Sequence, residues 1–326
     1  MSDFRAEVWS PGRYDAAPPR AAQEVTVIKN EIYSSYDLGA FKERQRRFFD
    51  LDFARRDIDV LEEIKKVVRD PALEKSIYPT SWDSFPRENR LWRARSIDRN
   101  AVMSGGLKTS DFWAPPAEYV GEGRLNRKNE PLLYACLGNP YGPLFEARLH
   151  DSSDAFALIS YKFKREIRFR RIGETNPDLS IPKPFREIEA EVSRFLAQVL
   201  SMPVFGKHTY SQTSKILHEL YFLEPGWEMG WIYGSVLFGP DVLNVALEPR
   251  LAREKLSIVN VVFAENIRDY QDDIFVDVIA YANNERNKDG KLKLWRRAAS
   301  SPISLNEFVL SLEFPDAFSK RELLDY

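Results

Sequence analysis

Apolar residues recur at helical spacing in three stretches of the chain. Between residues 39 and 70 they lie three or four positions apart, from Ile58 to Val68, and Asp70-Pro71 supplies a stop. Between residues 185 and 200 they form one continuous stripe along a helix face. A third helix is predicted at 211–220, where the sequence reads SQTSKILHEL. The pattern therefore predicts a helical region near the N-terminus and two more helices in the second half of the chain.

Strand-like patterns begin further along the chain. Alternation of apolar and polar residues is clearest in AFALISYKF (155–163) and continues through REIRFRRI (165–172). Short apolar runs at 231–238 and 243–248 indicate buried strands. Beyond residue 255 the pattern stays strand-like, with a tight turn at Asp289-Gly290. Because strands and helices are interspersed irregularly rather than in βαβ units, the sequence predicts an α+β fold.

Composition narrows the class of protein. The chain has 326 residues, 44% hydrophobic and 29% charged, which is typical of a globular protein long enough for two domains. Its net charge of −2 argues against a protein that coats nucleic acid. One cysteine and three histidines leave no internal disulfide and no zinc-ligand spacing, so we expect no metal and a reducing compartment, the cytoplasm. No apolar run approaches the ~18 residues of a membrane-spanning helix, and the N-terminus lacks a secretory signal.

Familiar catalytic motifs are incomplete in this sequence. GGLKTS (105–110) lacks the earlier glycine that a phosphate-binding P-loop requires. GEGRLN (121–126) has Asn126 where the third glycine of a dinucleotide-binding loop would stand. The three histidines are too scattered to define a Ser–His–acid triad. These motifs therefore point to no function.

Polar residues do stand at several positions where a strand or turn would ordinarily be apolar. Arg93 and Arg95 lie two positions apart and therefore share one face of any strand there. Arg124 follows a glycine pair. The others interrupt apolar runs or lie at the start of a predicted helix: Tyr134, Glu146 and Ser235. Taken singly, each is better explained as a surface residue or as a packed side chain whose polar end reaches solvent.

The order of these residues, with their surroundings, resembles the RES domain family, which is named for an arginine, a glutamate and a serine. The similar segments read LWRAR, APPAEYVGEGRLN, PLLYAC, PLFEARL, WIYGSVLF and LNVAL and lie within residues 90–250. The most specific block is 115–146. Two departures stand out: Leu125 replaces an aromatic residue, and Gly142-Pro143 replace the usual Thr-Ala before the glutamate. The first affects the packing of the pocket, and the second affects the start of the glutamate's helix.

The resemblance implies an ADP-ribosyltransferase-like twisted β core with flanking helices. Four parts are then expected along the chain: a flexible tail at 1–25, a helical N-terminal region at 26–88, a RES-like catalytic domain at 89–250 and a C-terminal β-rich extension at 251–326. The extension either stands apart or belongs to the catalytic domain.

The resemblance also implies the residues of a site. The implied catalytic residues are Glu146, Arg93 and Ser235. The implied NAD-binding residues are Arg124, Tyr134, Arg95 and Asn126. Either Arg93 or Arg95 could correspond to the arginine for which the family is named, because both share one strand face. An arginine's planar fork suits the diphosphate of NAD, and a fixed carboxylate stabilises the oxocarbenium ion that forms as nicotinamide leaves. Tyr134 is expected to stack on nicotinamide, and Ser235 to hydrogen-bond the ribose or the carboxamide.

The implied function is consumption of NAD by cleavage of its nicotinamide–ribose bond. NAD is then a substrate, with no permanently bound cofactor, and the acceptor stays open between water, as in a glycohydrolase, and phosphate, as in a phosphorylase. The resemblance further implies the toxin of a toxin–antitoxin pair, with an antitoxin protein and a second copy of the chain as expected partners. Direct contact with nucleic acid or a membrane is not expected. A protein ADP-ribosyltransferase is the first alternative, and a non-catalytic binding module is the second.

Overall fold

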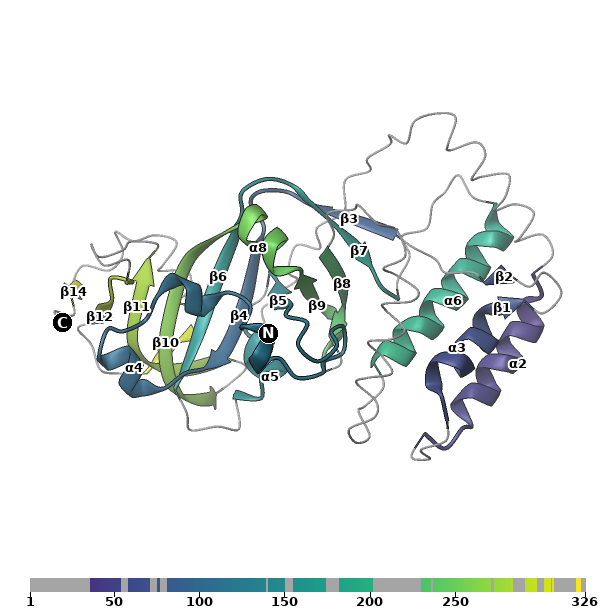
Figure 1. Ribbon diagram of the computed structural model, residues 1–326, viewed down its shortest axis with the longest axis horizontal. Helices are drawn as coiled ribbons and strands as arrows, with labels where there is room; N and C mark the ends of the chain where they lie inside the picture. The colour runs from purple at the N-terminus through teal and green to yellow at the C-terminus, as the bar shows by residue number, and fades with distance from the viewer. Residues whose placement is uncertain are drawn as a thin grey trace. The chain divides into compact units, whose positions relative to one another are not determined.

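The computed structural model describes residues 36–53, 58–70, 75–76, 81–138, 140–149, 155–173, 182–201, 230–235, 237–270, 273–283, 291–297, 302–305, 307 and 321–323 (Figure 1). The chain divides into two compact units. Unit 1 consists of Met1–Phe85, Gly123–Leu125 and Ile167–Trp227, and unit 2 of Pro86–Glu122, Asn126–Glu166 and Glu228–Tyr326. Each unit is thus assembled from three separate segments of the chain.

Unit 1 is built around helices. Its elements are α2 (Leu38–Phe49), α3 (Val60–Val68), α6 (Lys183–Ser201) and the short strands β1 (Arg69–Asp70), β2 (Lys75–Ser76), β3 (Ser81–Phe85) and β7 (Ile167–Arg171). Asp37 and Asp59 cap α2 and α3, because their carboxylates accept backbone N–H groups of the first turn. Phe195 of α6 contacts Phe41 and Phe48 of α2 edge to face, with ring centroids 6.1 and 5.2 Å apart. These aromatic contacts join helices that are far apart in sequence.

Unit 2 is a sheet of antiparallel neighbours in the order β14–β12–β11–β10–β6–β4–β5–β9–β8, with β13 beside β11. The strands are β4 (Arg90–Ser96), β5 (Leu133–Leu137), β6 (Phe156–Phe163), β8 (Gly230–Ser235), β9 (Gly239–Leu247), β10 (Leu256–Tyr270), β11 (Asp273–Asn283), β12 (Trp295–Arg297), β13 (Ile303–Ser304) and β14 (Arg321–Leu323). Three α-helices accompany them: α4 (Arg99–Met103), α5 (Gly142–Glu146) and α8 (Pro249–Lys255). Two 3-10 turns, η1 (Thr109–Phe112) and η2 (Ala117–Tyr119), complete the described elements of this unit.

A hydrophobic core fixes α5 against this sheet. Leu144 of α5 packs in one cluster with Trp92 of β4, Phe156 and Leu158 of β6, and Val262 of β10. All five side chains are buried, so leaving the cluster would expose a large apolar area to water. The core therefore sets where the C-terminal end of α5, which carries Glu146, lies on the sheet.

Several predictions from the sequence are confirmed. The fold is a mixture of helices and antiparallel strands, as an α+β fold requires, and α2, α3, α6, β6, β7, β8 and β9 lie where the patterns indicated. Strands also follow residue 255, as predicted. None of the described helices combines the length and apolar composition that a membrane span requires. The tail at 1–25, the helix at 211–220 and the turn at 289–290 lie outside the described residues.

Other features differ from the sequence-based expectation. Glu146 ends α5 rather than lying near its start. The helix stops there because Arg148 has a φ of 53°, in the left-handed region that an α-helix does not use. The N-terminal region also contains β1, β2 and β3 as well as helices. The expectation left open whether 251–326 belongs to the same domain as the preceding region; β10 and β11 lie in unit 2, in the same sheet as β4, β5 and β6.

Candidate functional site

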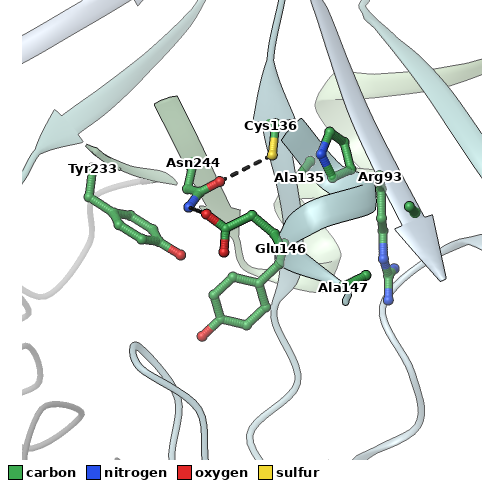
Figure 2. Close-up of a pocket in the computed structure, with 10 residues that line it drawn as sticks. Arg93, Ala135, Cys136, Glu146, Ala147, Tyr233 and Asn244 are labelled. Carbon is green, nitrogen blue, oxygen red and sulfur yellow. Dashed lines mark hydrogen bonds between the residues drawn. The ribbon is translucent and has the colours of Figure 1, made fainter. Parts of the chain in front are cut away.

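A cavity of about 290 Å³ opens in unit 2 where β4 and β5 part. The two strands pair at Leu91↔Leu137 and Trp92↔Cys136. Beyond these pairs β4 continues along β6, and β5 continues along β9. Residues from β4, β5, α5, β8 and β9 line the opening: Arg93, Ala94, Tyr134, Ala135, Cys136, Pro143, Glu146, Ala147, Tyr233 and Asn244 (Figure 2).

The carboxylate of Glu146 is held at this cavity by one of its two oxygens. Oε1 accepts a hydrogen bond from Ser235 Oγ at 2.6 Å and another from Asn244 Nδ2 at 2.8 Å. Within the described part of the chain, Oε2 accepts none, and Glu146 remains exposed to solvent. Figure 2 shows the carboxylate beside Asn244, with the ring of Tyr233 extending towards it. One oxygen is thus anchored and the other is left for a ligand.

Ser235 supports Glu146 from behind the cavity. Its side chain is only 2% exposed. While its hydroxyl donates to Glu146, the same oxygen accepts from the backbone N–H groups of Leu237 and Phe238, each at 3.1 Å. Ser235 is not among the residues that line the cavity. Its hydrogen bonds are therefore used within the protein, and the ligand contact expected from the sequence gains no support from this geometry.

Asn244 and Cys136 form the second support of Glu146. They are direct cross-strand partners on β9 and β5 and therefore lie on the same face of the sheet. Cys136 Sγ donates to Asn244 Oδ1 at 3.1 Å, while the amide nitrogen of Asn244 donates to Glu146. Burial, and to a smaller extent the negative charge of Glu146, raises the pKa of Cys136 above its usual range. The thiol is therefore protonated and able to donate.

Sequence reasoning did not select Asn244, Cys136 or Tyr233 as site residues. One signal was available, because Asn244 is an amide inside the otherwise apolar run LNVAL. Register supplies the missing information: Asn244 faces Cys136 on one side and Tyr233 on the other. Such cross-strand partners lie far apart in the sequence, so the pattern along the chain does not bring them together.

Arg93 and Arg95 share a face of β4, as their spacing predicted, but only Arg93 lines the cavity. Arg93 Nη1 donates to the carbonyl of Trp113 at 2.7 Å, and Arg95 Nη1 donates to the carbonyl of Asp111. Burial, followed by the positive charge of Arg93, lowers the pKa of Arg95, against an opposing effect of Asp111. The geometry therefore favours Arg93 over Arg95 as the cavity arginine.

Tyr161 lies close to both arginines. Its hydroxyl donates to the carbonyl of Phe112, so three successive carbonyls of the 111–113 segment accept from Arg95, Tyr161 and Arg93. Burial raises the pKa of Tyr161 to about 12, although the charges of Arg93 and Arg95 act in the opposite direction. This neutral phenol and the carbonyls hold the Arg93 side chain at the cavity, and no acidic side chain among the described residues pairs with it.

Tyr134 lines the cavity, and Asn126 fixes it there. The hydroxyl of Tyr134 donates to Asn126 Oδ1 at 2.8 Å. The amide nitrogen of Asn126 in turn donates to the carbonyls of Gly121 and Arg127, at 2.8 and 2.9 Å. Asn126 is buried and does not line the cavity. It joins the turn at 121–127 to the ring of Tyr134 rather than facing a ligand.

Arg124 is another predicted site residue that does not line this cavity, as with Arg95, Asn126 and Ser235. It belongs to unit 1, where its guanidinium donates to the carbonyl of Leu200 in the last turn of α6. A cation at the C-terminal end of a helix is favourable, because the free carbonyls there carry partial negative charge. This contact accounts for Arg124 by structural stabilisation alone.

Among the described residues, no group of three or more His, Cys, Asp or Glu side chains is arranged to hold a metal ion. No protein-family model matches the chain, and no curated protein matches it. The cavity presents a carboxylate fixed by neutral donors, a guanidinium and two tyrosine rings. This set suits a ligand that has an anionic group, an aromatic ring and an atom that becomes positively charged during a reaction.

Proposed function

We propose that this protein consumes NAD by cleaving the bond between nicotinamide and ribose. The observation that carries the proposal is the carboxylate of Glu146, at a cavity that Arg93 also lines. Ser235 and Asn244 anchor its Oε1, while Oε2 accepts no hydrogen bond from the residues that the structure describes. The resemblance to the RES family, read from the sequence, assigns this chemistry to the same glutamate and arginine.

The carboxylate acts on the charge that develops during cleavage. The bond from ribose C1′ to the nicotinamide nitrogen breaks, and its electron pair leaves with the nicotinamide, which becomes neutral. The ribose acquires oxocarbenium character, and the fixed negative charge of Glu146 stabilises it more than it stabilises the ground state. Water then bonds to C1′ and releases a proton, so the products are nicotinamide and ADP-ribose. Nicotinamide needs no proton to leave, so a single carboxylate suffices.

The other cavity residues bind and orient NAD. Arg93 has five N–H donors, so its bond to the Trp113 carbonyl leaves donors for the phosphate oxygens of the dinucleotide. Tyr134 and Tyr233 present aromatic rings at the same opening, which suits the planar nicotinamide. Ser235, Asn244 and Asn126 hold these groups in place, and of the three only Asn244 lines the cavity.

The wider proposal follows from the resemblance. It includes an ADP-ribosyltransferase-like core, the role of a toxin held in check by an antitoxin protein, and action in the cytoplasm. Two observations support this direction. Residues from the arginine, tyrosine and glutamate segments, far apart in sequence, line one cavity, and the serine bonds directly to the glutamate.

The test is release of nicotinamide from NAD by the purified full-length chain. We expect wild-type turnover, and a rate at least ~100-fold lower for Glu146→Gln, which keeps the size and hydrogen-bonding shape of the side chain but removes its charge. The matched control is Glu118→Gln, an exposed glutamate in η2, whose rate should equal that of the wild type.

Two other outcomes identify the alternatives. If label from adenine-labelled NAD enters protein, the acceptor is a protein side chain and the enzyme is an ADP-ribosyltransferase. If the wild type and Glu146→Gln leave NAD equally intact, the chain is a non-catalytic binding module and the proposal is wrong.

A further inference from the structure

We propose that Cys136 is a positioning residue that fixes the Glu146 carboxylate by setting the orientation of the Asn244 amide. The inference rests on the proposed function, because it concerns the same carboxylate. Cys136 itself is 2% exposed and Asn244 6% exposed, so the thiol acts through its neighbour and not on substrate.

The hydrogen bonds form a directed chain from the core to the cavity. Cys136 Sγ lies 3.1 Å from Asn244 Oδ1, and Asn244 Nδ2 lies 2.8 Å from Glu146 Oε1. An asparagine amide has an accepting end and a donating end. If the amide were reversed, its oxygen would face the carboxylate oxygen and its nitrogen would face the sulfur of the thiol. A donor at position 136 therefore selects the orientation in which the amide donates to Glu146.

The thiol can act as this donor because it keeps its proton. Burial and the nearby charge of Glu146 both raise the pKa of Cys136. An ionised thiolate would instead attract the amide nitrogen and turn the donor away from Glu146. Cysteine chemistry is thus used here in its neutral, hydrogen-bonding form rather than as a nucleophile or a redox group.

Packing restricts what else position 136 can hold. A Cβ placed on Gly142, the first residue of α5, would lie 3.4 Å from Cys136 Sγ. The start of α5 therefore rests almost directly on this side chain. A larger residue at 136 would displace the helix that carries Glu146, and an apolar residue of similar size would leave the Asn244 oxygen without its donor. Cysteine and serine are the small residues that meet both conditions.

The first test compares Cys136→Ala, which removes the donor, with Cys136→Ser, which keeps one. For Cys136→Ala we expect kcat for NAD cleavage to fall about fivefold at nearly unchanged KM, since Ser235 still holds Oε1 and the lost bond acts mainly on the transition state. For Cys136→Ser we expect kcat within about twofold of the wild type. Val245→Ala, a buried truncation on the opposite face of β9, is the packing control: its melting temperature should fall while its kcat stays unchanged.

A second measurement does not depend on NAD turnover. The side-chain amide signals of Asn244 in a ¹⁵N–¹H spectrum, assigned by their loss in Asn244→Leu, report whether both ends of the amide are bonded. We expect slow hydrogen exchange of this amide in the wild type, Cys136→Ser and Val245→Ala, and faster exchange in Cys136→Ala alone.

The outcomes separate this inference from the proposed function. If the wild type does not cleave NAD, the proposed function fails, and the exchange of the Asn244 amide still decides the role of Cys136. Unchanged exchange in Cys136→Ala overturns the inference. It is also overturned if the kcat of Cys136→Ser falls as far as that of Cys136→Ala, because the effect would then follow packing and not the donor.

Discussion

The residues that hold Glu146 are neutral, and this matters for what its carboxylate can do. Within the described residues Glu146 forms no ion pair, and both donors to Oε1 come from uncharged side chains. An arginine in their place would fix the carboxylate equally well but would cancel most of its field at a nearby cation. Neutral donors fix the geometry and leave the negative charge available, which is what stabilisation of an oxocarbenium ion requires.

Ser235 provides the clearest test of this arrangement at the scale of one residue. Ser235→Ala removes a donor from Glu146 and leaves the backbone N–H groups of Leu237 and Phe238 without their acceptor. We expect kcat to fall roughly tenfold and the free energy of unfolding to fall by about 1–3 kcal/mol. Steady-state kinetics and chemical denaturation measure the two effects. Ser235→Thr, which keeps the hydroxyl, should lose less of both, and equal losses in the two variants would contradict the assigned role.

The sequence predicted some of these residues and missed others for a physical reason. Arg93, Tyr134 and Glu146 are recognisable because each is a polar side chain embedded in its own characteristic local segment. Asn244 and Cys136 acquire their roles only from a cross-strand pair between β9 and β5. Arg124 shows the opposite case, since its turn looked suited to a ligand but its guanidinium binds the end of α6. Local patterns identify a candidate, and the register decides what it touches.

At the scale of the element, α5 is too short to be stable on its own. A helix of five residues makes few internal hydrogen bonds, so its position depends on tertiary contacts. Leu144 anchors it in the core, and Gly142 allows close approach to β9. The sequence predicted a helix here with Glu146 near its start, whereas Glu146 is its last residue. The left-handed backbone of Arg148 that ends the helix is not visible in apolar spacing.

Gly142→Ala tests how far the position of α5 controls activity. An added Cβ would lie 2.8 Å from Val242 Cγ1, closer than two carbon atoms can approach, so α5 must shift and carry Glu146 with it. We expect a loss of about 1–3 kcal/mol in stability together with at least a roughly fivefold fall in kcat. Because Val242→Ala removes the atom that clashes, the double variant should recover most of the activity lost in Gly142→Ala. Additive losses in this double-mutant cycle would rule out the clash as the cause.

At the scale of the whole molecule, the segments of the two units alternate along the chain, and no local sequence pattern predicts this. Unit 1 takes its third segment, Ile167–Trp227, from the middle of the region expected to form one catalytic domain at 89–250. Strands and helices were predictable from apolar periodicity because that signal lies within ten to twenty neighbouring residues. The partition into units depends on contacts such as Phe41–Phe195 and on pairings such as β6–β10, which join distant segments.

The isolated segment 89–250 should therefore not fold, even though it contains every residue that lines the cavity. It ends before β10, which pairs with β6 from Leu256↔Phe163 to Ala264↔Phe156 and so hydrogen-bonds one edge of this largely buried strand. Without β10, β6 becomes an apolar edge strand, which is a site of aggregation. We expect 89–250 to be insoluble or to lack a cooperative unfolding transition, in contrast to the full chain.

The fragment 1–250, which keeps every segment of unit 1, should retain the helical circular dichroism of α2, α3 and α6. Cooperative unfolding of 89–250 would show that the segment folds without β10 and β11 and without Met1–Phe85, which would contradict the prediction.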